Sequence, residues 1–100
     1  MKILIAVPPA QYHDKELAQV MAVFDQNKIP YEFASREAGQ AKGTFGGRVY
    51  VQFSFEDVIL KKEEEFDALA IMGGNGAQAH FWNNADLLEL IKILDRKIDV

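Results

Sequence analysis

The chain has 100 residues, 49% of them hydrophobic, which suits one globular domain with a core of its own. Its formal net charge is −4 and its 11 lysines and arginines are scattered, so nucleic acid is not an expected partner. There is no cysteine, which excludes a disulfide, a thiolate metal ligand or a cysteine nucleophile within these residues. No apolar run is long enough to cross a bilayer and the N-terminus lacks a signal-peptide pattern, so a cytoplasmic protein without a membrane partner is expected.

The first third of the sequence predicts a strand, a helix and a second strand. Residues 2–7 form an apolar run typical of a strand buried on both faces, and the two prolines at 8–9 end it. Residues 14–27 carry an apolar stripe at helical spacing, and Asp14 is expected to cap or charge the first turn of that helix. Residues 31–35 alternate like a short strand, which completes a βαβ unit.

The middle of the chain predicts loops and short elements. Residues 36–47 are polar and rich in glycine, and we expect a hairpin-like excursion there, followed by an extended piece at 48–51. The pattern lacks the GxxxxGK[ST] motif of a phosphate-binding loop, so turn chemistry is the better interpretation of its glycines. Residues 55–60 predict a short helical turn, and the charged run 61–65 predicts a solvated face.

The most informative stretch is residues 66–78. Asp67–Met72 is almost entirely apolar without alternation, which predicts a central parallel strand covered by helices on each side. It stops at Gly73-Gly74-Asn75-Gly76, where three glycines permit a tight turn and close approach of backbone N–H groups. Because sites in open α/β sheets form at the carboxyl ends of strands, one wall of a site is expected here.

The last part of the chain predicts a helix from about residue 83 to residue 97, with an asparagine N-cap and an apolar stripe that includes Ile91. Residues 98–100 read as the beginning of another strand. Only two good helices are predicted for a sheet that needs cover on both faces, so the fold is expected to be incomplete at its C-terminus.

Residues 74–79 also satisfy the GxGxxG/A dinucleotide fingerprint. That fingerprint belongs at the first βα turn, which here has prolines and no glycine, and residues 81–84 interrupt the helix that should follow. No nucleotide cofactor is therefore expected.

Taken in order, these pieces resemble the N-terminal half of a ThiJ/PfpI superfamily domain. The matching pieces are the first strand at 2–7, the helix start Asp14-Lys15-Glu16-Leu17, the strand at 31–35, the glycine-bearing hairpin at 42–47, the FDALxxxGG pattern at 66–74 and the WNNxxLLxL pattern at 82–90. The resemblance implies an α/β, flavodoxin-like three-layer sandwich of the class I glutamine amidotransferase-like type, with a mostly parallel sheet. Residues 1–100 would form the N-terminal portion of this single domain.

The resemblance also implies a catalytic site built around a cysteine beyond residue 100. Glu16 matches the family's buried glutamate, which hydrogen-bonds the cysteine, and Gly73 and Gly74 match the glycines whose N–H groups form the oxyanion hole. The alternative for Glu16 is a solvated glutamate in the first turn of the helix, where its charge is favourable. The alternative for Gly73 and Gly74 is a simple turn at the end of a strand. The chain would continue past Val100, be cleaved there, or meet its second half as a separate chain.

Three further residues are expected to line the pocket: Asn75, Gln78 and His80. Gln78 departs from the protease-like members, which carry a glutamate at this position, and a neutral amide cannot stabilise an imidazolium in the same way. This disfavours peptidase activity. His13 and His80 lack the spacing of metal ligands, so both are expected to be surface or cap residues, with no metal and no other cofactor.

The expected function is therefore that of a cysteine-dependent protein acting on small carbonyl, thioester or amide-like substrates, similar to a glyoxalase, deglycase or hydrolase, or that of a thiol stress sensor. A homodimer or higher homo-oligomer is implied by the resemblance. The alternative is a non-catalytic binding or assembly module that uses the Gly73–Gly76 turn as an anion site.

Overall fold

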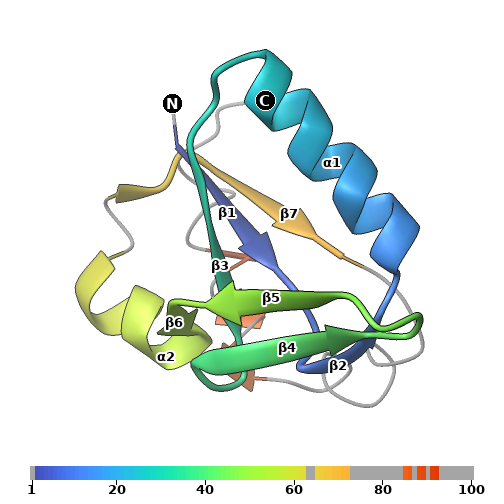
Figure 1. Cartoon of the computed structure of the whole chain (residues 1–100). Coiled ribbons are helices and arrows are strands. Elements are labelled where there is room, and N and C mark those ends of the chain that lie inside the picture. The colour runs from blue at the N-terminus through green and yellow to red at the C-terminus, as the bar shows by residue number, and fades with distance from the viewer. Residues whose placement is uncertain (1, 63–64, 73–84, 87, 90, 93–100) are drawn as a thin grey trace.

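A four-stranded parallel sheet forms the centre of the molecule. The computed structural model describes residues 2–62, 65–72, 85–86, 88–89 and 91–92. The strands are β1 (Ile3–Ala6), β3 (Tyr31–Ser35), β6 (Phe53–Ser54) and β7 (Ala68–Ile71), in the order β6-β3-β1-β7 (Figure 1). All three pairings are parallel, and Ile5 of β1 lies between Phe33 of β3 and Ala70 of β7. The predicted α/β fold with a mostly parallel sheet is confirmed.

The strand β1 is buried on both faces, as its continuous apolar sequence predicts. Its side chains alternate between two core clusters: Leu4 and Ala6 enter one cluster, whereas Ile3 and Ile5 enter the other. All four are less than a tenth exposed. The sheet is therefore covered on both sides, which requires one layer on each face.

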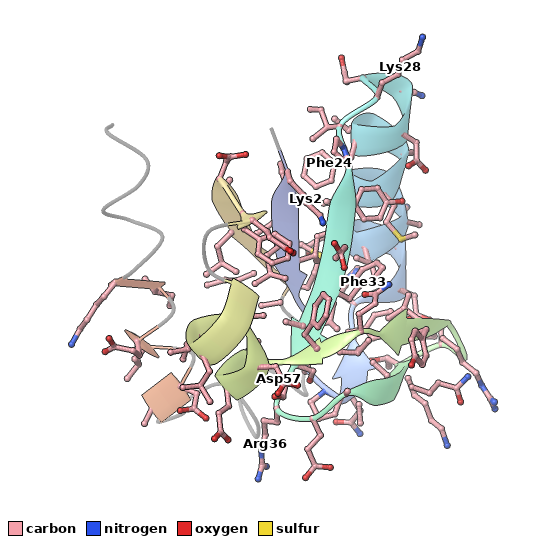
Figure 2. All side chains as sticks on the ribbon, turned by 90° about the vertical axis from the view of Figure 1, so that its left-hand side faces the viewer. Lys2, Phe24, Lys28, Phe33, Arg36 and Asp57 are labelled. Atoms are coloured by element: carbon pink, nitrogen blue, oxygen red, sulfur yellow. The ribbon has the colours of Figure 1, made fainter. Side chains whose placement is uncertain are left out.

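Helix α1 (Asp14–Gln26) covers one of these faces (Figure 1). Leu17 is its fully buried residue, and Phe24 points from the helix toward the sheet (Figure 2). The predicted helix is confirmed, and so is the prediction that His13 is a surface or cap residue. His13 is the N-cap, and its Nδ1 accepts a hydrogen bond from the backbone N–H of Glu16 at 3.2 Å. Asp14 lies in the first turn, where its charge was expected, but it does not cap the helix, because its carboxylate has other partners, described below.

The opposite face is covered by α2 (Phe55–Asp57), which runs into the π-helical turn η1 (Val58–Lys62). Phe55 and Val58 are buried against Leu4 and Ala34. The described residues between 85 and 92 are helical as well, and Ile91 packs against the same cluster. The short helical turn predicted for residues 55–60 is therefore confirmed, as is the later helix at the positions that the structure describes.

A second, three-stranded sheet lies across the carboxyl ends of β1 and β3 (Figure 1). It consists of β2 (Ala10–Tyr12), β4 (Gly39–Gly43) and β5 (Arg48–Val51), with β4 and β5 forming an antiparallel hairpin. The hairpin predicted from the glycine-rich segment is confirmed. The strand β2 was not predicted, because three residues after a pair of prolines carry no readable alternation.

The parallel strand predicted at residues 67–72 is confirmed as β7, whereas its predicted central position stays a prediction. The sequence predicts a central strand buried on both faces, but within the described residues β7 pairs with β1 alone and lies at the end of the sheet. Ile71 is 44% exposed, and the other residues of β7 are only half-buried. In the described part of the chain, no strand or helix covers the outer edge of β7. The strand predicted at residues 98–100 lies outside the described residues.

Ser35 and Ser54 give a pair of predictions with opposite signs. The two residues are register partners at the end of β3 and β6. Ser35 is fully buried, and its Oγ has no hydrogen-bond partner within the described residues. The Ser54 Oγ instead accepts from the Asp57 N–H at 3.1 Å and caps α2, while the Asp57 carboxylate accepts from the Ser54 N–H at 3.2 Å.

We therefore expect Ser35→Ala to leave the free energy of unfolding unchanged or to raise it by up to about 1 kcal/mol, because an unpaired buried hydroxyl is lost. The identical change Ser54→Ala should lower it by about 1 kcal/mol, because the capping bond is lost. Urea denaturation of both variants measures the two values. A clear loss of stability in Ser35→Ala would mean that the hydroxyl has a partner.

Candidate functional site

The carboxyl ends of β1, β3 and β7 meet at one end of the sheet. Lys28 precedes β3 and Arg36 follows it, and Figure 2 shows these two residues at opposite ends of the molecule. At the Arg36 end, the Met72 N–H donates to the Ala6 carbonyl at 2.8 Å and the Val7 N–H donates to the Ala34 carbonyl at 3.0 Å. The residue that precedes Gly73 is thus hydrogen-bonded to the end of β1, shortly before the chain enters α1.

Glu16 lies in the first turn of α1 and borders a groove between this helix and β7. The groove has a volume of about 320 Å³, and its walls are formed by Glu16, Gln19, Val20, Val23, Phe24 and Ala70. The Glu16 side chain is exposed, and no hydrogen bond or ion pair holds its carboxylate within the described ranges. The fold therefore brings Glu16 beside the carboxyl half of β7, which leads to the glycine turn.

The other predicted site residues lie outside the described part of the chain. These are Gly73, Gly74, Asn75, Gln78 and His80. The oxyanion role of the two glycines and the pocket-lining role of the remaining three stay predictions. The described residues hold no group of three or more possible metal ligands, and none of their helices is long and apolar enough to span a membrane.

Sequence reasoning missed the role of Asp14. One of its carboxylate oxygens accepts from the Phe45 N–H at 3.0 Å, and the other accepts from the Gly47 N–H at 2.7 Å. The N–H of Thr44 donates to the Tyr12 carbonyl at 3.1 Å. These bonds fasten the turn of the β4–β5 hairpin to the start of α1.

The hairpin glycines make this contact possible. A Cβ on Gly43 would overlap the Asp14 carboxylate, and a Cβ on Gly47 would crowd it too. The glycine-rich segment was expected to serve turn chemistry alone. It also forms a cradle of backbone N–H groups around a carboxylate of the same chain. No short-range pattern signals such a contact, since Asp14 and Phe45 are distant in the sequence.

The hairpin turn also sets the electrostatics of this region. The N–H of Phe45 holds the pKa of Asp14 below its usual value, partial burial opposes this effect, and the N–H of Gly47 reinforces it. The pKa of Tyr12 is raised, first by burial of the phenol and then by the nearby charge of Asp14. Asp14 is therefore a stable anion beside a buried phenol.

The hydrogen bonds that the Asp14 carboxylate accepts from the hairpin turn are expected to weaken in acid. Because the folded pKa is lower than the unfolded one, their stabilising effect is complete above about pH 4 and is lost as the pH falls through the folded value. The amide NMR signals of Phe45 and Gly47 should titrate together below about pH 4. Asp14→Asn should remove this titration. If the two amides titrate unchanged in that variant, another group controls the turn.

Comparison with known proteins agrees with this fold. The family model described as the DJ-1/PfpI family matches residues 1–97. The uncharacterized protein MJ0967 of Methanocaldococcus jannaschii is 33% identical over 91 residues, which cover 91% of this chain and 43% of that protein.

Two solved structures extend the comparison. The ThiJ/PfpI domain protein from Brachyspira murdochii superimposes with a TM-score of 0.86 at 26% identity, over 96% of this chain and 54% of that one. Oxidised DJ-1 from Toxoplasma gondii has a TM-score of 0.72 at 20% identity, over 91% of this chain and 48% of that one, and shows the fold alone. The chain spans about half the length of these relatives. By its sequence match and by its fold, the chain belongs to the DJ-1/PfpI family.

Proposed function

We propose that this chain supplies Glu16 and the Gly73–Gly74 turn to a cysteine-dependent site that acts on small carbonyl, thioester or amide-like substrates. The observation that carries the proposal is the groove shared by Glu16 and Ala70. Ala70 lies shortly before the glycine turn, so a glutamate from α1 and the end of β7 border one space. This arrangement supports a site at the carboxyl end of the sheet, where sites of open α/β folds form.

The chemistry of the proposal needs a thiolate from outside residues 1–100, because the chain has no cysteine. The thiolate sulfur would bond to the carbonyl carbon, and the π electrons would move onto the carbonyl oxygen. The N–H groups of Gly73 and Gly74 would donate to that oxygen, and such donors contribute roughly 3–4 kcal/mol in acyl-transfer enzymes. The Glu16 carboxyl group would hold or move the proton of the thiol.

The same residues would also suit a thiol stress sensor, because a carboxyl group beside a thiol controls its ionisation and hence its oxidation. Peptidase activity is not proposed, since Gln78 replaces the glutamate of the protease-like members. A cytoplasmic homodimer or higher homo-oligomer, with a small-molecule substrate, completes the proposal.

The experiment begins with intact mass spectrometry of the purified, denatured protein. A mass well above the 11.3 kDa of residues 1–100, or a second chain that carries a cysteine, is expected. The protein is then assayed with an α-ketoaldehyde, a thioester and an anilide, before and after alkylation with one equivalent of iodoacetamide. We expect turnover of at least one substrate and its loss on alkylation.

Two results would contradict the proposal. A single species of 11.3 kDa would leave the site without a nucleophile. Turnover that survives complete alkylation would show that no thiol takes part. Either result would favour the alternative, a binding or assembly module that uses the Gly73–Gly76 turn, and inorganic phosphate titrated against the protein would then test that turn as an anion site.

A further inference from the structure

A second groove lies on the other side of α1, between this helix and the β4–β5 hairpin. Its volume is about 330 Å³, which is large enough for a small organic molecule. The floor is apolar and the rim is polar. The floor is made by Leu17, Ala18, Met21 and Val49, and the polar part by Tyr12, Asp14, Gly47 and Arg48. Glu16 belongs to the groove on the β7 side, so the two grooves are separate.

Tyr12 is the feature that points to a ligand. Its side chain is only 2% exposed and belongs to the core cluster under α1. The hydroxyl of a tyrosine with a buried ring usually has a hydrogen-bond partner in the protein, in water or in a ligand. Within the described residues the Tyr12 hydroxyl has no protein partner. It is not one of their fully buried unpaired polar atoms, so it faces the open space of the groove. Because Tyr12 lines the groove, a molecule in the groove can supply the missing partner.

The rim carries one anion and one cation. The Asp14 carboxylate is held in place by the N–H groups of Phe45 and Gly47, so it is oriented before any ligand arrives. A Cβ on Gly47 would stand within 3 Å of both the Asp14 carboxylate and the Tyr12 hydroxyl, so these two oxygens converge beside Gly47. Arg48 is exposed, and no ion pair holds its guanidinium within the described ranges.

We propose that this groove binds a zwitterion with an apolar side chain, namely an apolar α-amino acid. Its ammonium group would donate to the Tyr12 hydroxyl and the Asp14 carboxylate, and its carboxylate would accept from the guanidinium of Arg48. Its side chain would lie on the floor formed by Leu17, Met21 and Val49. A ligand with a carboxylate alone would be repelled by Asp14, and one with an ammonium alone would leave Arg48 unpaired, so the two rim charges select a molecule that carries both.

The test is a titration of the full-length protein with L-phenylalanine, followed by amide NMR. We expect saturable shifts at Gly47, Arg48 and Val49. Tyr12→Phe and Arg48→Gln should each raise the Kd about tenfold, since each removes a hydrogen bond to a charged group. Phenethylamine lacks the carboxylate and 3-phenylpropionate lacks the ammonium, so both should bind at least about tenfold more weakly than phenylalanine.

Tyr50→Phe is the matched control. It removes the same hydroxyl from an exposed tyrosine of β5 that does not line the groove, and it should leave the Kd unchanged. The melting temperature of Tyr12→Phe should equal that of the wild type, because the hydroxyl has no partner within the described part of the protein.

Several results would overturn the proposal. These are the absence of saturable shifts in the wild type, an unchanged Kd in Tyr12→Phe, and either analogue binding as tightly as phenylalanine. A marked fall in the melting temperature of Tyr12→Phe would also overturn it, by revealing an internal partner for the hydroxyl. None of these results bears on the thiol chemistry proposed at Glu16, which lies on the other groove.

Discussion

Glu16→Gln in the full-length protein is expected to lower kcat/KM for its carbonyl substrate by roughly 10²–10⁴-fold, the usual contribution of a positioned acid or base. The amide has the size of the carboxyl group, but it neither releases nor takes up a proton. The substitution should leave the melting temperature unchanged, because the Glu16 side chain is exposed and has no partner among the described residues. A loss of activity can then be assigned to the site and not to the fold.

Glu56→Gln provides the control. Glu56 is an exposed glutamate in the first turn of α2, on the opposite side of the sheet, and its substitution removes the same charge. We expect wild-type kcat/KM for this variant. The rate of thiol alkylation by iodoacetamide, measured across pH, should change in Glu16→Gln and not in Glu56→Gln. If both variants keep full activity and the same alkylation profile, Glu16 is only a solvated glutamate in a first helical turn.

The elements that could be predicted from the sequence are those whose burial leaves a regular pattern. The run from Ile3 to Ala6 has no polar residue, and β1 is the strand with both faces buried. The spacing of Leu17, Val20 and Phe24 gives α1 its buried stripe, and its observed bounds follow the prediction closely. In both cases one local rule, burial on two faces or on one stripe, determines the structure.

Contacts between distant residues could not be predicted in this way. Asp14 was assigned to its own helix, where its charge is favourable, but its oxygens accept from Phe45 and Gly47 of the hairpin turn. The short strand β2 exists because it pairs with β4, and Gln11 within it has a φ of 58°, which no strand pattern suggests. The neighbours of a strand are likewise set by the whole fold, so the apolar run of β7 predicted burial that the described part does not provide.

The candidate site shows the same difference between features with a local sequence pattern and features formed by distant residues. The resemblance alone pointed to Glu16, since a glutamate beside an apolar stripe is usually a surface residue. The fold adds that this glutamate borders a groove with Ala70 of β7. The second groove, with Tyr12, Asp14 and Arg48, had no signal in the sequence, because it is formed by three segments that only the folded hairpin brings together.

Phe55→Ala is expected to have the largest effect on stability. Phe55 begins α2, is 1% exposed, and lies in the cluster that covers the face of the sheet opposite to α1. Removing its ring leaves a cavity against Leu4, Ala34 and Phe66, and such truncations cost about 3–5 kcal/mol. Since domains are stable by only about 5–15 kcal/mol, this is a large part of the total.

The matched control is Phe45→Ala, the same substitution at the tip of the hairpin, where the ring is 84% exposed. Its loss should change the free energy of unfolding by no more than about 0.5 kcal/mol, because little apolar surface is buried there and the Asp14 bond uses the backbone N–H of Phe45. Urea denaturation of the two variants gives the difference directly. Equal and small losses would mean that α2 does not belong to the core, and equal and large losses would mean that Phe45 is covered by a partner.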